Sequence, residues 1–198
     1  MYENVFADEK SDDLLPEEKS YKASFKKRLV FSVVFTALAV AFSFFSIIDA
    51  DIENTLMPMH IPVLLGGFAC GGPLGFLVGF VSPLIKFFFF ASGGAFFETL
   101  CCCFELAVCG CLSGYLFRAF PQKLPFYALN TAISLLSSKA AFFILKYLLT
   151  IFFSGTNVAP EVFISQRLAQ TLFGIVFQIV VVPVVVFVFK KAKIAFNS

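Results

Sequence analysis

The sequence predicts an all-α integral membrane protein with six transmembrane helices and cytoplasmic termini. Apolar residues make up 59% of the 198 residues and charged residues only 14%, whereas soluble domains average about 45–50% and about 25%. The mean hydropathy is +0.89. A net charge of +2 is too small for a nucleic-acid-binding surface. Since one spanning helix needs about 20 apolar residues, six would use about 120 residues and leave only short loops and one polar N-terminal segment.

Charged residues and Pro/Gly breaks divide the apolar part of the chain into its expected spans. These are residues 29–48, 57–71, 73–91, 95–118, 125–153 and 161–189. The second span is short and Gly-rich, and the Gly-Gly-Pro at 71–73 predicts a tight turn directly into the third. A long charged segment without a small-residue cleavage site precedes the first span, so we expect a retained helix rather than a signal peptide.

The distribution of basic residues predicts the orientation in the membrane. Lysine and arginine occur in residues 1–28, at Arg118 and Lys123, and at Lys190, Lys191 and Lys193. The loops at 49–59 and 154–160 have neither. The positive-inside rule therefore places the N-terminus, the 118–125 loop and the C-terminus in the cytoplasm. Both other loops then lie outside, and the number of spans must be even.

Three segments follow from this division. Residues 1–28 contain no apolar run that could form a core, so we expect a polar cytoplasmic segment. A more specific alternative for it is an amphipathic helix on the inner leaflet near residues 21–28. Residues 29–193 form the six-helix domain, and residues 194–198 form a short tail.

Charged residues inside the expected spans are the main indication of function. There are six, namely Lys86, Glu98, Glu105, Lys139, Lys146 and Arg167. A charge at the bilayer centre costs about 2.5–3.5 kcal/mol on insertion scales, so such residues usually pair or line a polar cavity. The two glutamates are seven residues apart, as are Lys139 and Lys146, and two helical turns place each pair on one face of its helix.

These residues predict a polar zone that opens toward the outside. His60 lies at the same level at the start of the second span, and hydrogen-bonding groups are added by Asn130, Ser134, Ser138, Gln166 and Gln170. Four cations face two carboxylates, and the two surplus cations favour an anionic ligand. The alternative is structural ion pairing, for example of Lys86 with Glu98, together with snorkelling of Lys146 to the interface.

Catalytic and metal-binding signals are weak. The chain has no P-loop, no H-E-x-x-H and no G-x-S-x-G motif, and its single histidine is His60. Six cysteines occur, at Cys70, Cys101, Cys102, Cys103, Cys109 and Cys111. Adjacent helical residues point about 100° apart, so the run of three cannot converge on one ion, and we expect the cysteines to pack as small apolar residues. No cofactor or metal is predicted.

Residues 57–86 read M-P-M-H-I-P-V-L-L-G-G-F-A-C-G-G-P-L-G-F-L-V-G-F-V-S-P-L-I-K. This stretch resembles the second and third helices of S components of energy-coupling factor (ECF) transporters, in the group that includes riboflavin, folate and pantothenate carriers. The resemblance lies in the H-I-P-V-L start at 60–64, the Gly-rich short helix at 66–72, the G-F-x-x-P-L at 79–84 and Lys86. The Phe104-Glu105-Leu106 segment also resembles the family's fourth helix, and the likeness spans roughly residues 29–190. The run of three cysteines and the long N-terminal segment depart from the family pattern.

The resemblance implies a substrate-capture subunit of the bacterial cell membrane. Such proteins bind a vitamin from outside, dock on a transmembrane coupling subunit driven by two ATPase subunits, and topple to carry the ligand inward. The 49–59 loop would act as a lid. The ligand is then a small water-soluble vitamin or precursor, with pantothenate or folate favoured, and the candidate binding residues are His60, Lys86, Glu98, Glu105, Lys139, Lys146, Arg167 and Gln170.

Ala37 and Ala41 form a small-xxx-small face on the first span. Such faces allow close approach of another helix. The resemblance implies that this face docks on the coupling subunit, and ordinary packing inside the bundle is the alternative.

Two other functions fit the residues alone. One is a membrane-embedded enzyme that acts on a lipid, with Glu98 or Glu105 as acid or base. The other is a small stand-alone channel or scaffold built on paired interior charges.

Overall fold

The computed structural model describes the backbone of residues 16–43, 57–90, 96–121, 123–154 and 160–191. It describes side chains from residue 25 onward in these ranges, except at 90, 124, 153–154, 160–172 and 189–191. The described residues form helices and contain no strand. The helices are α2 (Pro16–Phe42), α5 (His60–Cys70), α6 (Gly72–Phe90), α7 (Phe96–Ala119), α8 (Leu124–Ser154) and α9 (Pro160–Lys191). The expected all-α fold with six helices is confirmed.

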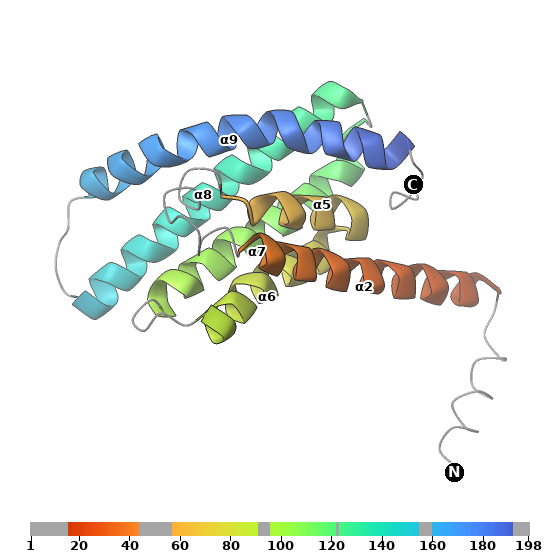
Figure 1. Ribbon diagram of the computed structural model, residues 1–198, viewed down its shortest axis with the longest axis horizontal. Coiled ribbons are helices and arrows are strands. Elements are labelled where there is room, and N and C mark those ends of the chain that lie inside the picture. The colour runs from red at the N-terminus through yellow and green to blue at the C-terminus, as the bar shows by residue number, and fades with distance from the viewer. Residues whose placement is uncertain (1–15, 44–56, 91–95, 122, 155–159, 192–198) are drawn as a thin grey trace, which may run out of the picture.

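Among the described residues, three helices have segments that are long and apolar enough to cross a membrane, namely Gly72–Phe89, Phe96–Ala119 and Pro125–Phe152. Shorter apolar segments occupy His60–Cys70 and Phe173–Val188. Figure 1 shows the beginning of α2 and the end of α9 at the same end of the bundle, which agrees with an even number of crossings. α7 packs against α5, α6 and α8, while α2 covers α5 and α6, and α9 covers α8 and α5.

The first helix begins earlier than the expected span. α2 runs without interruption from Pro16 to Phe42, so residues 16–28 are helical and continuous with the first apolar stretch. Proline is well suited to a first helical position because its missing N–H has no intrahelical acceptor there. A segment that extends an existing helix needs no core of its own, and a helix near residues 21–28 was the alternative that the sequence left open. Residues 44–48 of the expected span lie outside the described residues.

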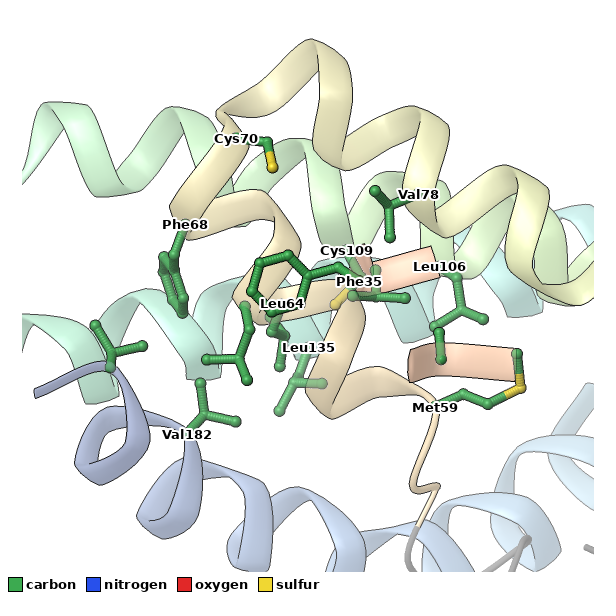
Figure 2. Packing of buried hydrophobic residues seen from close by; sticks show 14 of the residues in the cluster. Phe35, Met59, Leu64, Phe68, Cys70, Val78, Leu106, Cys109, Leu135 and Val182 are labelled. Atoms are coloured by element: carbon green, nitrogen blue, oxygen red, sulfur yellow. The ribbon is translucent and has the colours of Figure 1, made fainter. Parts of the chain in front are cut away.

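The short helix α5 lies at the centre of the bundle. Nine of its eleven residues are buried, and Val63 and Leu64 have no exposed surface. Figure 2 shows side chains of other helices meeting around it, among them Phe35, Leu135 and Val182. At 1.5 Å per residue α5 is about 16 Å long, about half the hydrocarbon thickness. Burial in protein, rather than in lipid, is what permits so short a helix.

The expected turn between α5 and α6 is present. Gly71 has φ +91°, a conformation that L side chains rarely adopt and that glycine adopts at little cost. Its N–H donates to Gly67 O at 2.9 Å, and its carbonyl oxygen accepts from the Gly75 N–H at 2.8 Å. A single residue therefore reverses the chain from α5 into α6.

Helices α6 and α7 cross with their backbones almost in contact. A Cβ atom at Gly75 would lie 2.3 Å from Gly110 O, and one at Gly110 would lie 2.2 Å from Gly75 O. Both glycines belong to Gly-x-x-x-Gly sequences, which continue to Gly79 and Gly114. This crossing holds α7 at a fixed height beside α5, and α7 carries the acidic residues discussed next.

Candidate ligand-binding site

Three charged or polar side chains from different helices meet inside the bundle. Glu105 on α7 forms an ion pair with Lys139 on α8, and His60 Nε2 at the start of α5 lies 3.1 Å from Glu105 Oε1. The exposed fractions of the three side chains are 5%, 9% and 8%. An ionised carboxylate only accepts hydrogen bonds, so the contact with His60 places a proton on Nε2. We call these residues the inner cluster.

Met57 joins the inner cluster through its backbone and its sulfur. Its carbonyl oxygen accepts from the His60 backbone N–H at 3.0 Å and from Gln178 Nε2 of α9 at 3.1 Å. Lys139 Nζ donates to its thioether Sδ at 2.9 Å. Met57 has φ +48°, and left-handed backbone costs a non-glycine residue about 1–3 kcal/mol. Contacts from α5, α8 and α9 therefore hold this residue in a strained conformation.

A polar stripe continues from the inner cluster along α8. Asn130 Nδ2 donates to Ser113 O on α7 at 3.1 Å, and Ser134 Oγ donates to Asn130 Oδ1 at 3.1 Å. Ser138 is also buried and donates to Leu135 O. These three residues recur every four positions, so they share one side of α8, and the Asn130 contact places that side against α7. Each hydroxyl and amide contact removes the desolvation cost of a polar group in an apolar interior.

A second ion pair joins the same two helices. Lys146 Nζ lies 3.0 Å from Glu98 Oε1, with side-chain exposed fractions of 19% and 57%. Lys146 Nζ also lies 5.7 Å from the centre of the Phe142 ring. Lys146 thus reaches a carboxylate, and its snorkelling to the membrane interface stays a prediction. We call Glu98 and Lys146 the outer pair.

The candidate site residues thus fall into separate groups. His60, Glu105 and Lys139 come together, and Glu98 and Lys146 form the outer pair. Lys86 is half-buried on α6, a helix that packs against α2, α5 and α7. The side chains of Arg167 and Gln170 lie outside the described residues. Both lysines of α8 lie against a carboxylate, so these two of the four expected cations are paired with the two glutamates.

Sequence reasoning missed two contributors to this region. Met57 acts through a carbonyl oxygen and a thioether, and neither leaves a signature in the sequence. Gln178 is fully enclosed at 1% exposure. A glutamine in the middle of an apolar span was the available signal, because an amide at that depth needs hydrogen-bond partners inside the protein.

The alanine face of α2 is open. Ala37 and Ala41 are exposed, while Ala39 has no exposed surface. The neighbouring Val33 and Val34 are also exposed, at 64% and 53%. Packing inside the bundle therefore does not explain the small residues at 37 and 41.

The cysteines lie mostly in the interior. Cys101, Cys103 and Cys109 have 1% exposure or less, in keeping with a packing role. Among the described residues no group of three or more potential metal ligands occurs. Nothing in the described contacts explains why three cysteines are consecutive.

A family model for the substrate-specific component of ECF transporters matches residues 27–186. The match begins in α2 and ends in α9, and it confirms the family resemblance. No curated protein and no solved structure matches the chain. Members of this family are transport subunits of membranes, and they associate with the membrane and ATPase subunits of an ECF module. The chain therefore belongs to the substrate-specific components of ECF transporters and is the substrate-binding subunit of such an importer.

Proposed function

We propose that this chain captures a small water-soluble vitamin or vitamin precursor from outside a bacterial cell and binds it at the inner cluster. The observation that carries the proposal is the contact of His60, Glu105 and Lys139 in the buried interior of the bundle. Desolvating charged groups costs several kcal/mol each, and replacing them with apolar residues of similar volume is often neutral for stability. Binding of a ligand by His60, Glu105 and Lys139 would account for buried charged groups that stability alone does not require.

Pantothenate and folate are the favoured ligands within this proposal. Both are small anions with several polar groups. Lys139 and Lys146 each lie against a carboxylate, and Lys86 and Arg167 are the other two basic residues of the candidate set. Those two residues, together with Gln170, are proposed to bind the negatively charged part of the ligand.

Delivery would use the open face of α2. Ala37 and Ala41 are exposed on it and are proposed to dock on the transmembrane coupling subunit. Small side chains let a partner helix approach closely. Two ATPase subunits on that partner would supply the energy, and the 49–59 loop is proposed to cover the ligand before delivery.

Calorimetric titration of the full chain in lipid nanodiscs tests this function, with pantothenate and folate as probes. Lys86→Ala and Arg167→Ala should each weaken binding by about 1–3 kcal/mol, the worth of a hydrogen bond to a charged group. Lys139→Met should weaken it at least as much. Lys146→Met is the matched control, since it alters the same residue type on the same helix face in the outer pair, and its effect should be smaller. Equal affinity in all four variants and the wild type would refute the site.

A further inference from the structure

Lys139 has an unusual set of hydrogen-bond acceptors. Its ammonium group has three donors, and within the described residues it is in contact with Glu105 and with the sulfur of Met57. A thioether is a weak acceptor. A buried ammonium with 9% side-chain exposure gains little from such a partner, so one donor of Lys139 is poorly satisfied.

His60 presents the opposite imbalance. Its Nε2 carries the proton that Glu105 accepts, so in the neutral ring Nδ1 is an acceptor. Nδ1 is fully enclosed and has no hydrogen-bond partner among the described residues. The nearby Met57 carbonyl oxygen already accepts two hydrogen bonds, from His60 N and Gln178 Nε2, and it has no proton to offer Nδ1.

The two imbalances lie on neighbouring side chains. His60 Nε2 and Lys139 Nζ both contact Glu105 Oε1, and Met57 contacts Lys139 through its sulfur and the His60 backbone N–H through its carbonyl oxygen. The charges of Glu105 and Lys139 cancel, and a neutral His60 adds none. A full negative charge beside Glu105 would find no surplus cation in this cluster, whereas a neutral group with a carbonyl oxygen and an N–H would satisfy both residues.

We propose that the thioether of Met57 is a placeholder, which occupies a hydrogen-bonding position on Lys139 in the ligand-free protein. The ligand displaces it with the carbonyl oxygen of an amide-type group, and the N–H of that group donates to His60 Nδ1. The strained backbone of Met57, at φ +48°, favours this exchange because a residue released from the left-handed region loses that strain. The inference rests on the proposed capture function and refines it. A carboxylate on the same ligand would lie away from Glu105.

The chain carries its own reporter and control for this proposal. It has three methionines, and Met59 lies two residues from Met57 but is packed in the core at 7% exposure. Labelling the methionine methyl groups with ¹³C in the full chain gives few NMR signals, and Met57→Leu and Met59→Leu assign the two that matter. The probes are acetamide, acetone and acetate, three isosteric molecules that differ in the N–H donor and in the charge.

Acetamide should shift the Met57 methyl signal in a saturable way and leave the Met59 signal in place. Acetone lacks the N–H donor for His60, and acetate carries a negative charge. To produce the same Met57 shift, each should need a concentration at least about tenfold higher than acetamide, equivalent to about 1.4 kcal/mol of binding free energy. No saturable Met57 shift with acetamide overturns the proposal. So does a stronger response to acetate or acetone, which would indicate an anion-binding or a merely apolar site.

Pantothenate and folate form a separate arm that tests the capture function. If one of them binds by calorimetry and the Met57 signal does not move, the placeholder is refuted while capture stands. If acetamide displaces Met57 and neither vitamin binds, capture of those two vitamins is refuted while the placeholder stands.

Discussion

The inner and outer ion pairs have the same composition and join the same two helices. Glu98 and Glu105 are seven residues apart on α7, and Lys139 and Lys146 are seven apart on α8. The helices are antiparallel neighbours, so the second pair repeats the first two turns farther along. Only the surroundings differ, since the inner side chains are 5% and 9% exposed and the outer ones 57% and 19%.

The difference shows that burial, not residue type, decides what such a pair does. An exposed pair gains about 0–1 kcal/mol because solvent screens it and two long side chains must be ordered. A buried pair has lost its hydration, so each member depends on the other and on further hydrogen bonds. The inner pair has those additional contacts, from His60 and Met57. It is therefore both the more vulnerable pair and the one better organised to hold a ligand.

The largest effect should come from removing one inner partner. Glu105→Ala leaves the buried ammonium of Lys139 without a counter-charge, and we expect the free energy of unfolding to fall by about 3–5 kcal/mol. Unfolding in mixed detergent micelles, followed by circular dichroism, measures this change. Glu98→Ala is the matched control, with the same substitution on the same helix, and it should cost no more than about 1 kcal/mol. Similar losses in both variants would mean that burial does not separate the pairs.

A smaller effect should follow from moving α7 away from α6. A Cβ atom at Gly110 would lie 2.2 Å from the backbone oxygen of Gly75, so Gly110→Ala should lower the free energy of unfolding by about 1–3 kcal/mol through overpacking. It should also weaken ligand binding, because α7 positions Glu105. Gly66→Ala is the control, since its Cβ would meet side chains and no backbone atom, namely Phe35 at 3.3 Å and Val78 at 3.4 Å. An equal loss in Gly66→Ala would contradict the importance of the backbone crossing.

Replacing both inner partners should cost less stability than removing one. Glu105→Leu combined with Lys139→Met leaves no buried charge, so its free energy of unfolding should return to within about 1–2 kcal/mol of wild type. Binding of the vitamin should still be lost. The same unfolding and calorimetric measurements apply, and a stable double variant that binds like wild type would show that the inner pair does not serve the ligand.

The sequence predicted the faces of these helices but not which residues meet. Spacing of seven residues is enough to place two glutamates on one side of α7. Which lysine reaches which glutamate depends on the relative height of α7 and α8, and that height follows from packing between helices. Proximity in the chain suggested Lys86 for Glu98, and the contact of Glu98 with Lys146 of α8, 48 residues away, could not be read from the sequence.

The short helix α5 and the start of α2 also show that local sequence preferences predict helices and turns but not how the helices pack. Glycines and Gly-Gly-Pro predicted a brief α5 and its tight turn, because those are local preferences. Its central position could not be predicted, since it depends on α2, α6, α7 and α9 packing against it. Residues 16–28 were expected to lack a core, but they continue an existing helix, and elongation is far less costly than nucleation. Met57 contributes atoms that every methionine has, so only its surroundings give it a role.

The smallest expected effect concerns the response of the two pairs to salt. A double-mutant cycle with Glu98→Gln and Lys146→Gln should give a coupling energy of about 0.2–1 kcal/mol at low ionic strength. At about 1 M salt the screening length falls to about 3 Å, so this coupling should approach zero. The corresponding cycle with Glu105→Gln and Lys139→Gln should change little, because salt does not enter a site at 5% and 9% exposure. Unfolding measurements at both salt concentrations provide all the terms. If the inner coupling fell as steeply as the outer one, water and ions would have access to the inner cluster. Water could then hydrogen-bond to Lys139, and the Met57 thioether would not be the partner that a ligand displaces.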